Sequence, residues 1–178
     1  MAVVVPNIND ALIDASFAGQ SDEVKKLVKA GADINYISPD LNYVYVPTAL
    51  HQAIFHKDME LIRFLVENGA ETNIATNACS PPLHWAVSAE SEQLVQYLLD
   101  NGASPNKVSL GWNVTPLMKA VTQNSLEIVS ILVTHGANVL AINKCGLSAF
   151  DIAIKNGNAK IFEFLARCLV SGQTSLNP

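Results

Sequence analysis

The chain has little cysteine, little charge and few basic residues. Its 178 residues include three cysteines, charged residues make up 15% of the sequence, and the net charge is −5. The apolar start, Met1 to Pro6, has no basic leader and is far too short to span a membrane or to form a secretory signal. We therefore expect no membrane association, and we expect the mature chain to begin near Met1.

Basic residues are sparse, and the glycines are not clustered. The main basic cluster consists of Lys25, Lys26 and Lys29, set against an overall acidic excess that would repel phosphate groups. We therefore expect no nucleic-acid partner. The glycines are spread along the chain rather than gathered in a phosphate-binding loop. No nucleotide or other cofactor is expected.

An internal repeat is present instead. Gly-Ala begins at residues 31, 69, 102 and 136, with spacings of 38, 33 and 34 residues. A second set of positions keeps the same period, because a large apolar residue is followed three residues later by alanine. These pairs are Leu12/Ala15, Leu50/Ala53, Leu83/Ala86, Leu117/Ala120 and Phe150/Ala153. Agreement between the two sets predicts a protein built from repeated structural units.

Each unit contains the signals of two helices. Thr48, Thr115 and Ser148 can cap a helix start, and proline at 82 and 116 suits a first helical turn. A second helix follows in each unit, with apolar residues at the spacing of one helical face. These faces are Leu61-Ile62-Leu65-Val66, Leu94-Val95-Leu98-Leu99 and Ile128-Val129-Leu132-Val133. The glycine of Gly-Ala then ends the second helix in a left-handed conformation.

The signature of these units resembles the ankyrin-repeat family. Its Thr-Pro-Leu-His pattern appears as Thr48-Ala49-Leu50-His51, Pro81-Pro82-Leu83-His84 and Thr115-Pro116-Leu117-Met118, and it degenerates to Ser148-Ala149-Phe150-Asp151. The resemblance covers residues 9–170. It implies an all-α ankyrin-repeat solenoid of about five helix-turn-helix units joined by β-hairpin-like loops, with degenerate first and last units acting as caps.

The predicted organisation is a single repeat domain. Residues 1–8 form an N-terminal lead-in, and residues 171–178 a polar C-terminal tail. Between them we place approximate units at 9–46, 47–79, 80–113, 114–146 and 147–170.

Candidate chemistry in the sequence is weak. His51 and His84 occupy the same place in successive units, where the resemblance implies bonding to local backbone rather than catalysis. Cys79 and Cys145 share a hairpin position two units apart, so roughly 16–20 Å should separate them. That distance is too large for a disulfide, which favours a reducing compartment. With Cys168 the chain has three cysteines, an odd number, and their spacing is not that of metal ligands.

Two hairpins depart from the regular pattern. The first is five residues longer than the regular hairpins and carries Tyr36, Tyr43 and Tyr45. Another hairpin has one extra residue, which places Trp112 at its tip. Tyrosines exposed there suggest a contact surface, although they could also fold back on the next unit.

Large aromatic residues also occur on the first helices. The position two beyond the signature leucine reads Asp14, Gln52, Trp85, Lys119 and Ile152, and three residues further on come Phe17, Phe55, Ser88, Thr122 and Lys155. We expect both positions to face solvent on the concave side, with Phe55 and Trp85 as neighbours. Packing between repeats is the alternative. The predicted partner-binding residues are Tyr36, Tyr43, Tyr45, Phe55, Trp85 and Trp112.

The family resemblance implies a non-catalytic protein-interaction module that acts as an adaptor, a stoichiometric inhibitor or an effector, including a bacterial effector delivered into a host cell. We expect a cytoplasmic monomer, in the host cytosol if it is such an effector, with no metal. The alternative is an enzyme or enzyme subunit whose chemistry is not visible in this chain. Asn35, Asn73 and Asn106 each follow Gly-Ala by three residues, and we interpret them as braces of the hairpins.

Overall fold

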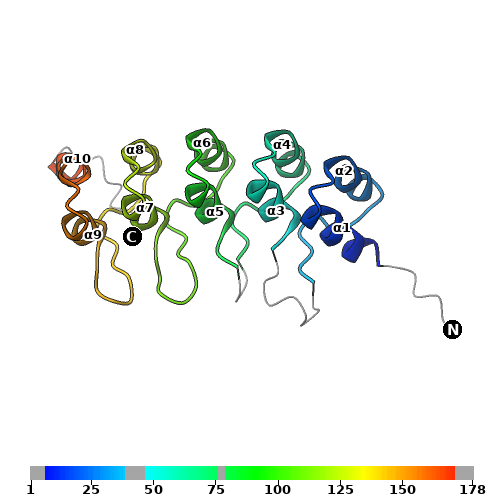
Figure 1. Cartoon of the computed structure of the whole chain (residues 1–178), viewed down its shortest axis with the longest axis horizontal. Coiled ribbons are helices and arrows are strands. Elements are labelled where there is room, and N and C mark those ends of the chain that lie inside the picture. Colours follow the sequence, from blue (N-terminus) through cyan, green and yellow to red (C-terminus); the bar gives the residue numbers. More distant parts are fainter. Residues whose placement is uncertain (1–6, 39–46, 76–78, 171–178) are drawn as a thin grey trace. The chain divides into compact units, whose positions relative to one another are not determined.

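The computed structural model describes residues 7–38, 47–75 and 79–170, and these residues form ten α-helices (Figure 1). The helices are α1 (Ile8–Phe17), α2 (Ser21–Lys29), α3 (Ala49–Phe55), α4 (Met59–Glu67), α5 (Pro82–Ser88), α6 (Glu92–Asp100), α7 (Pro116–Thr122), α8 (Leu126–Thr134), α9 (Ala149–Lys155) and α10 (Ala159–Val170). Within the described ranges the fold is all-α, and its β structure is limited to isolated bridges such as that between Ile142 and Ser148.

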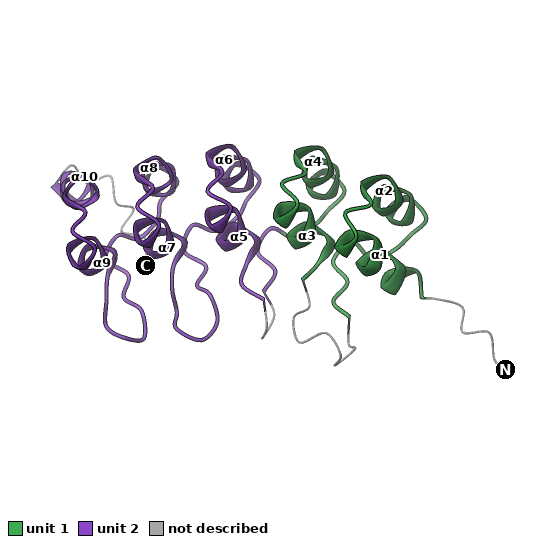
Figure 2. Ribbon diagram, in the orientation of Figure 1, with its two compact units in different colours: residues 1–71 green, residues 72–178 purple. Residues whose placement is uncertain are grey.

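The chain forms two compact units, coloured separately in Figure 2. In residues 1–71, α1 pairs with α2 and α3 pairs with α4, while α1 packs against α3 and α2 against α4. In residues 72–178, α5, α7 and α9 form one layer of neighbouring helices, and α6, α8 and α10 form the second. The hairpin loops extend from the layer of odd-numbered helices within each unit (Figure 1).

The core of each unit lies between the paired helices and consists of the periodic apolar residues. Leu65 in α4 and Leu98 in α6 are both fully buried, as is Leu132 in α8. The signature leucines at 12, 50, 83 and 117 are buried to 1% exposure or less. A single helix pair could not cover these side chains, so neighbouring pairs within a unit complete the burial.

The predicted helix ends are present. Pro82 and Pro116 stand in the first turns of α5 and α7, and the Thr115 hydroxyl accepts a hydrogen bond of 3.1 Å from the Met118 amide. Ser148 and Asp151 cap α9 reciprocally, because the Asp151 carboxylate accepts from the Ser148 amide at 2.8 Å. The glycines of the Gly-Ala pairs at 31, 69, 102 and 136 have φ between 85° and 97°, which is the left-handed conformation expected at a helix C-terminus.

Candidate functional site

The hairpin side of residues 72–178 carries a group of exposed apolar side chains. Trp112 is 66% exposed at the tip of the hairpin between α6 and α7, and Ile142 is 65% exposed in the next hairpin, between α8 and α9. Their companions are Val108, Leu110 and Leu140, which are 36%, 51% and 52% exposed. We call these five residues the hairpin patch. Exposed large apolar side chains on neighbouring hairpins are typical of an interaction surface.

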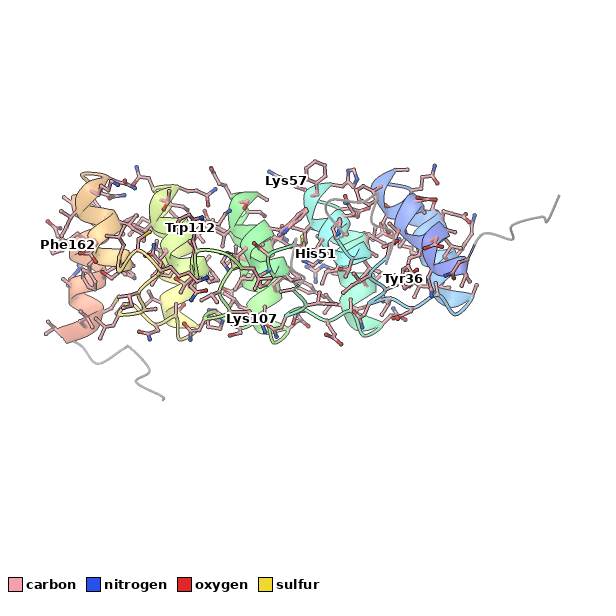
Figure 3. The ribbon with its side chains drawn as sticks, turned by 90° about the horizontal axis from the view of Figure 1, so that it is seen from below. Tyr36, His51, Lys57, Lys107, Trp112 and Phe162 are labelled. Atoms are coloured by element: carbon pink, nitrogen blue, oxygen red, sulfur yellow. The ribbon has the colours of Figure 1, made fainter. Side chains whose placement is uncertain are left out.

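Backbone geometry presents Trp112 to solvent. The Ser109 amide donates to the Val114 carbonyl at 2.9 Å and closes the loop. Gly111 and Asn113, on either side of Trp112, have φ of 90° and 53°. Two left-handed residues make this turn tight, and glycine and asparagine are the residue types that tolerate such values. Figure 3 shows Trp112 from below, the side toward which the hairpins extend in Figure 1.

The hairpin patch is held together by a hydrogen bond between its two hairpins. The Lys144 amide donates to the Trp112 carbonyl at 3.0 Å. The second hairpin is closed by Asn143, whose side-chain oxygen accepts from the Cys145 and Leu147 amides at 2.9 and 3.0 Å. Both hairpins are therefore fixed before any partner arrives, which lowers the ordering cost of binding.

Asparagines brace the hairpins in both units. The Asn106 side-chain amide donates to the Gly136 carbonyl at 3.0 Å, and its oxygen accepts from the Asn138 amide at 2.7 Å. Asn73 bonds in the same way to Gly102 and Ser104, and Asn35 to Gly69 and Glu71. Each asparagine thus ties its hairpin to the start of the following one, and the bracing role predicted from the sequence is confirmed.

The two repeated histidines both bond to backbone groups and have structural roles. The His51 Nδ1 accepts a hydrogen bond from the Thr48 amide at 3.2 Å, which is the expected local contact. The His84 Nε2 instead donates to the Lys107 carbonyl at 2.8 Å, so the expectation of a local partner is wrong for His84. Burial lowers the pKa of His84 to about 4, with a smaller opposing effect of the bond to Lys107 and a further lowering by the charge of Lys119. His84 is therefore neutral at physiological pH.

The predicted partner residues lie in both units. Phe55, in residues 1–71, is 65% exposed at the end of α3. Tyr36, in the same unit, is half-buried, and its hydroxyl donates to the Asp10 carboxylate at 3.0 Å. Tyr43 and Tyr45 lie outside the described residues. Joint placement of the predicted set on one surface stays a prediction.

Trp85 corrects one expectation. The position two beyond the signature leucine does not face solvent throughout, because Gln52 is only 6% exposed and Trp85 is half-buried. Burial raises the pKa of the Cys79 thiol to about 12, and a hydrogen bond from Trp85 to that thiol acts in the opposite direction. The indole is thus partly used in packing. The position three residues further on is the exposed one in every repeat: Phe17, Phe55, Ser88, Thr122 and Lys155.

Sequence reasoning identified Trp112 but missed Leu140 and Ile142. The signal was available, since two large aliphatic residues stand in a hairpin segment where polar residues are usual. The thiols also differ, because Cys79 and Cys168 are buried whereas Cys145 is exposed, and none of the three is in a disulfide. In the described ranges, no three His, Cys, Asp or Glu residues are grouped to hold a metal ion.

The repeat architecture and its bracing asparagines define the class of protein. Residues 11–109 and 83–174 each match the family model for ankyrin repeats (3 copies), and the chain belongs to the ankyrin-repeat family. Among curated proteins it is similar to mouse "Ankyrin repeat and SOCS box protein 11", with 39% identity over 49 residues. The match covers 28% of this chain and 15% of that protein. Among the described helices, none combines the length and apolar character needed to cross a bilayer.

Proposed function

We propose that this chain is a non-catalytic module that binds a partner protein through its hairpins and the exposed positions of its first helices. Ankyrin repeats are generally protein–protein interaction modules, and the family membership supports this class. The observation that carries the proposal is the hairpin patch, in which Trp112 and Ile142 are about two-thirds exposed on hairpins fixed to each other by a hydrogen bond. Exposed aromatic anchors on a rigid frame are typical of binding hot spots.

The predicted partner-binding residues differ in how strongly their exposure supports the proposal. Trp112 and Phe55 have large exposed areas and are its strongest members. Tyr36 and Trp85 are half-buried, and each has a hydrogen-bond partner, so they contribute less accessible area. Tyr43 and Tyr45 are included on the evidence of the sequence alone.

The cellular role follows from the partner. An adaptor, a stoichiometric inhibitor and an effector, including a bacterial effector acting in a host cell, all use such a module in the same physical way. We propose a cytoplasmic monomer that binds no nucleic acid and needs no cofactor. No specific observation favours the alternative of an enzyme or enzyme subunit.

Affinity capture with the full chain as bait tests the proposal, with the captured proteins identified by mass spectrometry. Trp112→Ser and Phe55→Ser remove exposed anchors and are expected to weaken retention of a specific partner by tenfold or more, on the order of 2 kcal/mol each if the anchors are central. Glu60→Lys and Glu127→Lys alter exposed positions of the even-numbered helices α4 and α8, and they serve as matched controls.

Each variant must keep the melting transition of the wild type within a few degrees. Retention that survives both aromatic changes but is abolished by Glu60→Lys and Glu127→Lys would place the working surface on the even-numbered helices and contradict the proposal. Turnover of a substrate by the isolated chain would favour the enzyme alternative.

A further inference from the structure

The hairpin side of residues 72–178 is cationic as well as apolar. Its two hairpins and the helices α7 and α9 carry four lysines, Lys107, Lys119, Lys144 and Lys155, and one acidic residue, Asp151. Asp151 is already engaged, because its carboxylate caps α9 and accepts a hydrogen bond from the Ser148 amide. In the described part of the chain, none of these lysines has a carboxylate within salt-bridge distance.

Two of the lysines adjoin the hairpin patch directly. Lys107 precedes Val108, and Lys144, whose amide bonds to the Trp112 carbonyl, follows Ile142 by two residues. Both lysines are exposed, and Lys107 is visible with Trp112 in Figure 3.

A third lysine is tied to the same region through His84. The imidazole of His84 donates to the Lys107 carbonyl, and the charge of Lys119 acts on that imidazole. Lys119 therefore lies near the base of the first of the two hairpins. Positive charge without a carboxylate partner in the described residues thus adjoins exposed apolar side chains on a braced frame.

We propose that the hairpin patch binds an acidic, apolar segment of a partner protein, in which Asp or Glu side chains flank aliphatic or aromatic ones. This inference rests on the proposed function and adds the chemistry of the partner. The apolar side chains of the segment cover Trp112 and Ile142, while its carboxylates pair with Lys107 and Lys144. Complementary charge of this kind steers association and selects against basic competitors.

The apolar component distinguishes such a segment from nucleic acid. A phosphate backbone would use the lysines but would leave the exposed aliphatic side chains of the patch uncovered in water. The chain as a whole is also acidic, with a net charge of −5, which opposes a polyanion more than a short peptide.

The test begins with a random peptide library displayed on phage and selected on the full chain. The proposal predicts that recovered peptides are rich in Asp or Glu together with large apolar residues. A recovered peptide is then labelled with fluorescein, and its affinity is measured by fluorescence anisotropy at low and high salt. Lys107→Glu combined with Lys144→Glu is expected to weaken binding on the order of tenfold or more, and added salt is expected to weaken wild-type binding.

The matched control reverses two charges on another face of the same unit. Lys160→Glu combined with Arg167→Glu changes two exposed residues of α10 and should leave the peptide affinity within about twofold. Both double variants must melt as the wild type does. Equal loss of affinity in the two double variants would indicate a general effect of net charge and would overturn the proposal.

Other outcomes are equally decisive. Recovery of basic peptides, or of no binding peptide, overturns the inference, as does tighter binding to a duplex DNA oligonucleotide than to any peptide. Self-association that the Lys107→Glu and Lys144→Glu changes abolish would assign the patch to a second copy of this chain. A captured partner that depends on Trp112 but not on these lysines would leave the proposed function standing and reject only its acidic, apolar chemistry.

Discussion

The two compact units are built from the same kind of repeat but differ in net charge. Residues 1–71 contain ten acidic and five basic residues, whereas residues 72–178 contain six of each. The net charge of −5 therefore resides in the first unit. The buried leucines of the two units occupy the same repeat positions, so the core is conserved while the exposed positions vary. The comparison shows that this fold constrains its interior and leaves its surface free to acquire specificity.

The difference is clearest on the hairpins and first helices. In residues 1–71 these elements carry Asp10, Asp14 and Asp33, all of them exposed. In residues 72–178 the equivalent elements carry the four lysines around the hairpin patch. A charged segment that is attracted to these elements in one unit would therefore meet charge of its own sign on those of the other.

The largest expected effect tests whether the two cores are equivalent. Leu65→Ala in α4 and Leu98→Ala in α6 each truncate a fully buried side chain. Each should lower the free energy of unfolding by about 2–5 kcal/mol in chemical denaturation, through lost burial and the cavity left behind. Glu127→Lys, at an exposed site, should change it by less than about 0.5 kcal/mol. A loss below about 1 kcal/mol at either leucine would break the equivalence of the cores.

A smaller effect concerns the second unit alone and depends on pH through His84. The pKa of His84 is lowered from 6.5 to about 4 in the folded state, so the unfolded chain binds more protons between these values. The contribution of His84 is thus fully present above pH 6.5 and is lost as the pH falls toward 4. Between about pH 7 and pH 5 the loss should be roughly 2 kcal/mol.

The control for this pH effect is His84→Gln, which cannot take up a proton. Its stability should fall less than that of the wild type over the same pH range, as measured by urea unfolding. Equal pH slopes for the two proteins would show that His84 does not titrate as the buried environment requires.

The smallest effect concerns the turn between paired helices, where the repeats place either glycine or a strained residue. Gly19 and Gly157 have φ of 66° and 67° there, whereas Lys57 and Glu90 adopt 55° and 53°. Left-handed backbone costs a residue with a side chain about 1–2 kcal/mol. Lys57→Gly in the first unit and Glu90→Gly in the second should each raise stability by about 0.5–1 kcal/mol. The gain is smaller than the relieved strain because glycine also raises the entropy of the unfolded chain.

The stability of these turn variants is measured by thermal unfolding. Gly157→Ala makes the opposite change, since it introduces a side chain at a left-handed position. Part of the gain at Glu90 should be offset, because its carboxylate accepts a weak bond of 3.4 Å from Gln123 that glycine cannot make. Destabilisation by both glycine substitutions would show that the backbone at this turn is not strained.

Much of the fold could be predicted from the sequence because it depends on contacts that recur with the repeat. The leucine faces, the prolines in the first turns, the caps at Thr115 and Ser148 and the left-handed glycines after each second helix are all local patterns. The candidate site was predicted less completely. Trp112 was found because its hairpin interrupts the regular spacing, whereas Ile142 stands in a hairpin of ordinary length and was marked only by its aliphatic side chain.

By itself the sequence determined the helix pairs, the core and the bracing asparagines, since a fixed period assigns each residue a place in its unit. Only the tertiary structure decided how deeply individual side chains lie and which distant residues they meet. Trp85 is half-buried, His84 bonds to Lys107, and the Lys144 amide bonds to the Trp112 carbonyl. These contacts depend on the distance and rotation between neighbouring repeats of one unit, and a periodic pattern along the chain carries no information about either.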